Sequence, residues 1–533
     1  MELWDDLDYR EIGAYKLGCF YSESFSGVPL ESDLISPVGV GRTGGLMKTL
    51  RLIVLLHETS HLLHDLSLGV CMDLDYSLDF ADGVLKAALR EMQRLHRYEG
   101  VRCPLLGSEN RWAWMADKDL RGAFEIVESM EAMKGRLLGR TPGLSRYALG
   151  LSGEFRGVEA DLDKLSGRML MEGLVVVKTV SALAERIRDP EDMTYLHENL
   201  SSLNILPENL DDPYQVARRI FDRTIGGYLT GGYDYRRDPW PIIYINSPRM
   251  LCDLGFVYLA DIALHIPPVF VRDKWIRKGK YAPDDFIPVK RFCRMLSTLL
   301  RWGCFPMGNA QADPEHFYND LFDEFARAHR WPTIGETNLQ WKTQLALMRE
   351  KRKEAVDGYR FRMVVERENR PHAIIMRGPL SACWSQFIPV LHLTPTGYKL
   401  FRGLQTTQNL TLMPMEFSDM MADEIFFTNL PLWKNVPDQI RLDDHKAMEE
   451  WNLDMNNVNL IMQEAVYRSM CRELYRALLY KKSLTCPFSK QGCRTAQPAC
   501  KRITELGSIP KERCCLFRYL QQDKLDPNSY YWQ

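Results

Sequence analysis

The arrangement of apolar and polar positions along the chain changes character near residue 358. Before that point, long segments combine apolar residues with good helix formers, and several of them begin close to an aspartate. One of them ends at Gly139 and is followed by Pro142, which is a typical helix stop. We predict helices over residues 45–68, 82–98, 117–139, 159–187, 212–229, 247–264, 289–303 and 340–358.

After residue 358 the apolar segments are short, rich in branched and aromatic residues, and separated by Pro and Gly. This pattern indicates strands, which we predict over residues 359–368, 372–379 and 387–403. A last helix is predicted over residues 456–482, and no internal repeat suggests a solenoid. We therefore predict a mainly α, multi-domain protein with a smaller α+β C-terminal region. The expected divisions are a helical region over 1–345, an α+β region with short strands and a closing helix over 346–480, and a cysteine-rich basic tail over 481–533.

Length and composition fit an ordinary folded protein. The chain has 533 residues, enough for two to four domains, and 45% of them are hydrophobic. Its net charge of −2 gives no overall field that would attract nucleic acid or an anionic membrane, although local basic patches remain possible. The N-terminus lacks the order of a secretory signal, and no apolar run approaches the roughly 20 residues that span a bilayer. We expect a soluble, cytoplasmic protein with no membrane partner.

The segment "LIVLLHETSHLLHDL", residues 52–66, places polar residues inside an otherwise apolar helix. His57 and His61 are four residues apart, so on a helix they lie on one face and can share a metal ion. Zinc suits such a pair because it binds neutral imidazole and prefers tetrahedral coordination. Glu58 would lie beside the metal without occupying it, as a general base must.

This HExxH arrangement resembles that of the zincin metallopeptidases, over the three residues His57, Glu58 and His61. The resemblance implies an intracellular zinc-dependent endopeptidase whose catalytic region lies within residues 1–345. In such enzymes zinc lowers the pKa of its bound water toward about 7, and the glutamate takes a proton and passes it to the leaving amine. The metzincin pattern is excluded, because His64 replaces its glycine and Ser67 replaces its third histidine.

The same segment also fits a core helix whose histidines make hydrogen bonds. In that interpretation the HExxH helix is inert or structural, and the protein is a scaffold or sensor. Its C-terminal half would then bind a protein or nucleic-acid partner. A third interpretation is a latent protease that a regulatory protein activates. His64 lies about 10 Å along the axis from His57, so we expect it beside the cleft and not on the metal.

Catalytic zinc needs a third protein ligand, which in the gluzincin branch is a glutamate from a later helix. The segment "AFEIVESMEAMKG" resembles that glutamate helix, which makes Glu128 the candidate. Alternative ligands are Glu125, Glu131, Asp73 and Asp75. Either aspartate would make the site that of an aspartate-type zincin. Possible oxyanion donors, among which the sequence does not choose, are Tyr233, Tyr235 and His197.

The helical wheel around Glu128 supports two interpretations. An apolar stripe, made by Ile126, Met130, Met133 and Leu137, lies almost opposite the glutamate, as in an ordinary solvated helix. On the glutamate's own side, Ala132 and Gly135 are small enough to admit a second helix. Three neighbouring glutamates also repel one another, which a bound cation would relieve.

The C-terminal tail holds a cluster of cysteines at Cys486, Cys493, Cys500, Cys514 and Cys515. Their spacing matches no standard zinc finger, yet four thiolates could hold a second, structural zinc ion or an iron–sulfur cluster. Free reduced thiols are the alternative, and disulfides are disfavoured without a secretory signal. The tail is also basic and could contact nucleic acid, although basic side chains usually only interact with solvent.

Overall fold

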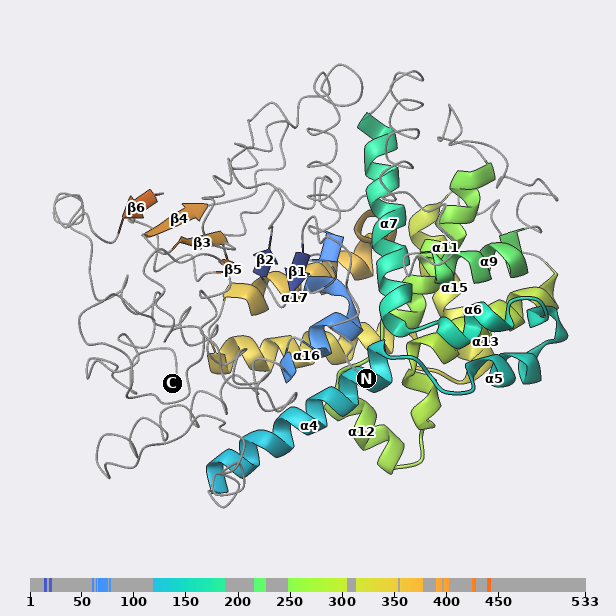
Figure 1. The fold of residues 1–533 in the computed structure, drawn as a ribbon, viewed down its shortest axis with the longest axis horizontal. Coiled ribbons are helices and arrows are strands. Elements are labelled where there is room, and N and C mark those ends of the chain that lie inside the picture. Colours follow the sequence, from blue (N-terminus) through green and yellow to red (C-terminus); the bar gives the residue numbers. More distant parts are fainter. Residues whose placement is uncertain are drawn as a thin grey trace, which may run out of the picture.

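The computed structural model describes part of the chain and is mainly α (Figure 1). The described residues are 14–16, 19–21, 60–61, 64, 66–74, 76–77, 118–186, 215–226, 248–303, 313–352, 355–376, 390–394, 397–401, 424–427 and 439–441. Helical residues between 60 and 77, interrupted at Leu68, form what we call the histidine helix because it carries His61 and His64. The predicted helices over 82–98 and 456–482 lie outside the described residues.

The longer helices follow one another along the middle of the chain. They are α4 (Lys118–Leu138), α5 (Leu144–Leu151), α6 (Glu159–Lys164), α7 (Gly167–Arg186), α9 (Val216–Phe221), α11 (Pro248–Leu264), α12 (Val269–Arg277), α13 (Pro288–Trp302), α15 (Pro314–His329), α16 (Ile334–Arg352), α17 (Ala355–Asn369) and α18 (Pro371–Met376). Shorter helical turns are η3 (Gly153–Phe155), η4 (Asp222–Gly226) and η5 (Pro283–Phe286).

Strands are few among the described residues. A two-stranded antiparallel pair joins β1 (Ala14–Lys16) to β2 (Cys19–Tyr21). An antiparallel sheet has the order β5-β3-β4-β6, with strands β3 (Val390–Thr394), β4 (Gly397–Phe401), β5 (Glu424–Phe427) and β6 (Gln439–Arg441). Strands β3 and β4 lie within 387–403, where the sequence predicts strands.

Helix α11 lies at the centre of the main hydrophobic core. Its residues from Phe256 to Leu264 are buried, and it packs against α7, α13 and α18. The ring of Phe256 makes edge contacts with Phe221 of α9 and Phe292 of α13, at centroid distances of 5.9 and 6.2 Å. A helix that is apolar around most of its circumference has to be enclosed by others in this way. Its two buried aspartates, Asp253 and Asp261, pair with Arg218 and Arg367.

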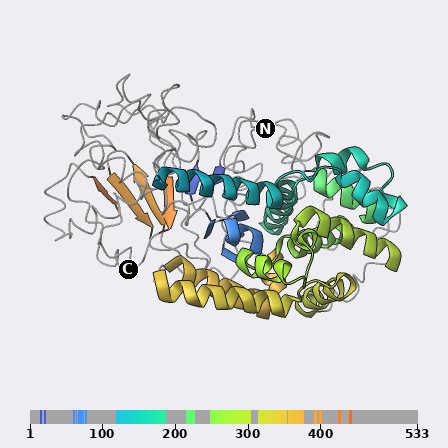
Figure 2. The same ribbon diagram turned by 90° about the horizontal axis from the view of Figure 1, so that it is seen from below.

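The histidine helix lies between α4 on one side and α16 with α17 on the other (Figure 2). Met72 packs against Trp341 of α16 and Val364 of α17. On the other side, Ser77 contacts Met133 of α4 through its hydroxyl. His61 and His64, at the start of the same helix, are also buried, as the apolar residues around them predict.

The prediction of one helix over 159–187 is wrong, because the chain turns between α6 and α7. Leu165 is extended there, and the Ser166 hydroxyl accepts a hydrogen bond from the Met169 amide at 3.2 Å. Gly167 follows, where an added Cβ would lie only 1.9 Å from the carbonyl oxygen of Leu137. The turn lets α7 start against the end of α4, which only glycine permits at this position.

The prediction of strands over 359–368 and 372–379 is also wrong, because these residues form most of α17 and α18. The buried positions of α17 include Asp357, Arg360, Val364 and Arg367, which follow a helical spacing of three and four. Three of these four side chains are charged. Apolar periodicity therefore does not reveal the buried face of α17.

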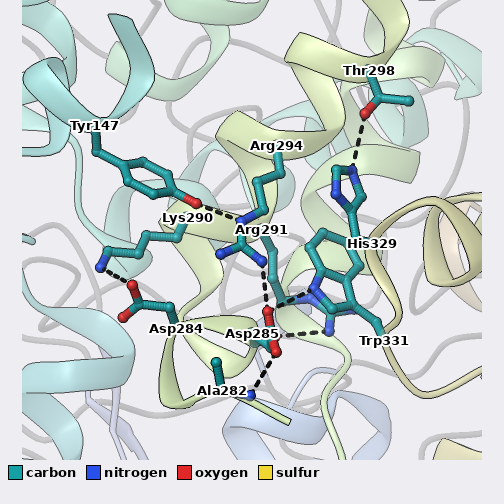
Figure 3. A network of polar contacts seen from close by, with 10 residues as sticks. All are labelled: Tyr147, Ala282, Asp284, Asp285, Lys290, Arg291, Arg294, Thr298, His329 and Trp331. Carbon is teal, nitrogen blue, oxygen red and sulfur yellow. Dashed lines mark hydrogen bonds and ion pairs between the residues drawn. The ribbon is translucent and has the colours of Figure 1, made fainter. Parts of the chain in front are cut away.

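A network of polar contacts around Asp285 fixes the start of α13 (Figure 3). The Asp285 carboxylate accepts hydrogen bonds from the Ala282 amide at 2.8 Å, from Arg294 at 2.6 Å and from the Trp331 indole at 3.3 Å. Arg291 lies over the Trp331 ring, 4.3 Å from its centroid. One carboxylate thus joins η5, α13 and the segment that leads into α16.

Within the described residues, no single helix has the length and apolar character needed to cross a bilayer. Two consecutive helices, Cys252–Leu264 and Val269–Arg277, are together long and apolar enough to span a bilayer, but the chain bends by 67° between them. The first member of this pair belongs to α11, which is buried within the protein core.

Candidate functional site

The structure describes some of the predicted site residues. His61, His64, Asp73, Glu125, Glu128 and Glu131 are described. The other candidates lie outside the described residues, and these are His57, Glu58, Asp75, His197, Tyr233, Tyr235, Cys486, Cys493, Cys500, Cys514 and Cys515.

His61 lies next to a carboxylate that is absent from the predicted ligand set. Its Nε2 atom lies 3.1 Å from the Oε2 atom of Glu172 on α7. Both residues are buried, with exposed fractions of 9% and 7%. Two donors bound to one tetrahedral zinc, each about 2.0–2.1 Å from it, are about 3.3 Å apart, so the observed separation suits a shared metal ion. The same distance also suits a direct hydrogen bond from His61 to Glu172.

The other oxygen of Glu172 faces a cation. Its Oε1 atom lies 3.5 Å from the Nε atom of Arg168, one helical turn earlier on α7. The carboxylate is therefore held between Arg168 and His61, with one oxygen toward each. A carboxylate that binds a metal is commonly oriented in this way by a second contact.

His64 turns toward a different residue of α7. Its Nε2 atom lies 3.1 Å from the Nζ atom of Lys178, and both side chains are buried. Burial lowers the pKa of Lys178 to about 8, so at neutral pH its ammonium donates and His64 accepts. Burial and then the charge of Lys178 lower the pKa of His64 well below its usual range. His64 is thus a neutral imidazole, and its ring centroid lies 6.3 Å from that of His61.

Glu128 is not brought to His61. Its side chain is exposed on α4, whereas Val127, Met130 and Met133 of the same helix are buried. Gly135 is predicted to admit a second helix, but a Cβ added there would meet no atom within 4 Å. Glu128 therefore occupies an ordinary solvated helix face, and Glu172 replaces it as the candidate third ligand.

The two other glutamates of α4 are no closer to a metal-binding arrangement. Glu125 is exposed. Glu131 forms an ion pair with Lys134 at 3.3 Å, one helical turn away on the same helix. Glu125 is thus a solvated side chain and Glu131 is paired with a lysine of its own helix, and neither shows the arrangement that His61 and Glu172 share.

Asp73 has a structural role at the start of α12. Its carboxylate is buried and pairs with Arg272 of α12. It also accepts a hydrogen bond from the Val269 amide, at the start of the same helix, at 2.9 Å. Burial raises the pKa of Asp73 to about 6, and Arg272 acts in the opposite direction. Asp73 thus attaches α12 to the histidine helix.

One feature of the sequence could have indicated Glu172. It is the only acidic residue between Leu165 and Ala184, a stretch dominated by Leu, Val, Met and Ala. A single carboxylate inside an apolar helix is costly to bury unless a partner compensates its charge. The local resemblance to a gluzincin glutamate helix favours Glu128 instead.

Among the described residues, no three His, Cys, Asp or Glu side chains form a group that could hold a metal ion. The described residues therefore supply two neighbouring donors, His61 and Glu172, and not a complete metal site. Comparison of the chain with family models, curated proteins and solved structures gives no match.

Proposed function

We propose that this protein is an intracellular zinc-dependent endopeptidase, with His57, His61 and Glu172 as metal ligands and Glu58 as general base. The observation that carries the proposal is the buried pair of His61 Nε2 and Glu172 Oε2, 3.1 Å apart on neighbouring helices. The pair completes the sequence motif with a glutamate from a later helix. It replaces Glu128 in the proposed ligand set.

The residues of the chain have separate tasks in this proposal. A bound zinc ion would supply Lewis acidity and lower the pKa of its water. Glu58 follows His57 directly in the sequence, and on a helix it would lie about 100° around the axis from it, where its carboxylate could accept a proton from a water molecule and pass it to the leaving amine. Arg168 orients Glu172, and the neutral ring of His64 lies beside the ligands without adding charge. The proposed substrate is a protein or peptide.

The remaining regions keep their predicted roles as part of the same proposal. Residues 1–345 would form the catalytic region, residues 346–480 an α+β region that selects or regulates the substrate, and residues 481–533 a basic tail. Within that tail, Cys486, Cys493, Cys500 and Cys514 would hold a structural metal ion. A regulatory protein partner, which would make the protease latent, also belongs to this proposal.

Metal content of the purified full chain tests the proposal first. We expect a stoichiometric zinc ion in the wild-type protein, and its loss in His61→Ala. His316→Ala is a matched control, because His316 also lies 2.7 Å from a carboxylate, that of Asp313, but on the exposed surface of α15. A folded wild-type protein without zinc would refute the enzyme and favour the scaffold interpretation.

Activity is tested with the variant Glu58→Gln, incubated with a peptide library and with a cell extract. We expect this variant to keep its zinc and to lose cleavage, because the amide cannot accept the proton. Substrates bound by this inactive variant would then identify the protein class that is cleaved. Equal cleavage by Glu58→Gln and the wild-type protein would remove Glu58 from the proposed mechanism.

A further inference from the structure

Helix α12 lies at the surface of the protein core, and one face of the helix is exposed. The chain turns by 67° between α11 and α12, through Pro267 and Pro268. Helix α11 is buried, whereas α12 lies at the lower edge of the described ribbon in Figure 1. The second helix is therefore a surface element carried by the core.

The exposed face of α12 combines an aromatic ring with basic side chains. Phe270, Lys274, Arg277 and Lys278 are all exposed, and their spacing of four, three and one places them on one side of the helix. Phe270 is unusual among large apolar residues because 49% of its surface is exposed. The opposite side of α12 includes Arg272, which is buried against Asp73.

The basic side chains on this face are not neutralised within the described part of the chain. Lys274 and Lys278 form no ion pair there, whereas Lys290 pairs with Asp284 and Lys342 pairs with Glu368. Asp273 is the only acidic residue between 269 and 280, a stretch that exposes Lys274, Arg277 and Lys278. Lys280, just beyond the helix, is not part of this charge because it pairs with Glu336 at 3.5 Å. The face thus carries unmatched positive charge next to an exposed ring.

The position of α12 is fixed before any partner binds. Asp73 holds its first turn through the Val269 amide and Arg272. After its last turn, Gly279 adopts a φ of 68° in the left-handed region, which glycine tolerates best. Lys280 then lies over the ring of Trp275, at 4.9 Å from its centroid. A surface that is already ordered loses little conformational entropy on binding.

We propose that the exposed face of α12 docks on an anionic phospholipid surface. Phe270 would enter the boundary between headgroups and acyl chains, and Lys274, Arg277 and Lys278 would contact the headgroup phosphates. Nucleic acid fits less well, because Phe270 is the only ring among the exposed side chains of residues 269–280, so bases have a single surface on which to stack. One ring and a few charges predict reversible binding that weakens as salt rises. The proposal does not depend on the metal site.

Vesicle sedimentation with the full-length protein tests this proposal. We expect stronger binding to vesicles of phosphatidylcholine with phosphatidylserine than to vesicles of phosphatidylcholine alone. The double variant Lys274→Glu/Lys278→Glu should lower partitioning by about thirty-fold or more, and Phe270→Ser should lower it at constant charge. These positions are exposed, so the variants should fold normally by circular dichroism.

The control is Arg146→Glu/Arg327→Glu, which reverses two exposed basic residues on α5 and α15 and should bind like the wild-type protein. Equal binding to both kinds of vesicle would overturn the proposal. So would equal effects of the α12 and control variants. Binding of an oligonucleotide that is lost in the α12 variants, without vesicle binding, would assign the same face to nucleic acid instead.

Discussion

Glu172 of α7 shares its carboxylate between two residues, with Oε2 at 3.1 Å from His61 and Oε1 at 3.5 Å from Arg168. The first contact joins two helices that are far apart in the sequence. The second lies within α7 and fixes the orientation of the carboxylate. Together they distinguish Glu172 from the exposed glutamates of α4.

Replacement of Glu172 should therefore show whether Glu172 or Glu128 is the third zinc ligand. We expect Glu172→Ala to lose stoichiometric zinc, because one of the three protein donors is removed. Glu128→Ala is the matched control, since its side chain is exposed, and it should keep the zinc of the wild-type protein. Metal analysis of both purified variants measures the difference. The reverse result would restore Glu128 to the ligand set.

Replacement of Arg168 tests whether it positions the carboxylate. Arg168→Ala leaves all proposed ligands in place, so we expect zinc to bind more weakly by about 10–100-fold and not to disappear. Competition with a chelator of known affinity gives this number. Arg146→Ala, on the exposed side of α5, should bind zinc as the wild-type protein does. An Arg168 variant with unchanged zinc affinity would leave the ion pair without a role in the site.

The buried pair of Arg367 on α17 and Asp261 on α11 should dominate the stability of this part of the fold. Both side chains are fully buried, and Tyr318 also donates to Asp261 at 2.6 Å. Arg367→Met leaves the carboxylate without its cation, so we expect the free energy of unfolding to fall by about 3–5 kcal/mol. Denaturation by urea, followed by circular dichroism, measures the loss.

A second variant shows whether that loss comes from the unpaired charge. Arg367→Met/Asp261→Asn has no charge left to compensate and keeps an acceptor for Tyr318. We expect it to be more stable than Arg367→Met alone. If the double variant is less stable than the single one, lost packing and not the bare carboxylate explains the effect.

His265 should make stability depend on pH. Burial, followed by the charge of Arg367, lowers its pKa to about 3, against about 6.5 in an unfolded chain. As the pH falls from about 7 toward about 4, the unfolded state therefore takes up a proton that the folded state does not. Stability should fall by up to about 1.4 kcal/mol per pH unit over this range.

The variant His265→Gln removes that titration while its amide can still donate to Asn338, which His265 contacts at 2.9 Å. We expect a shallower fall in the free energy of unfolding with pH than in the wild-type protein. Urea denaturation over the same pH range compares the two slopes. Parallel slopes would show that His265 titrates alike in the folded and unfolded chains.

Much of the helical fold could be predicted from apolar patterning. Helices α4, α11 and α13 lie where the sequence predicts them, and the buried residues of α4 include Met130, Met133 and Leu137 of the predicted stripe. Helix α17 was missed because its buried face holds Asp357, Arg360 and Arg367. Each of these has a partner in another segment, as Asp357 does in Tyr76 at 2.5 Å.

The helical class, the buried setting of His61 and the HExxH motif follow from local patterns, because apolar periodicity and residue spacing are local properties. Tertiary packing selects the carboxylate that meets His61, and it places Glu172 there while Glu128 stays exposed. It also decided that charged residues form the inner face of α17. Both outcomes depend on the packing of distant helices, since a buried charge is stable only where another segment supplies its partner.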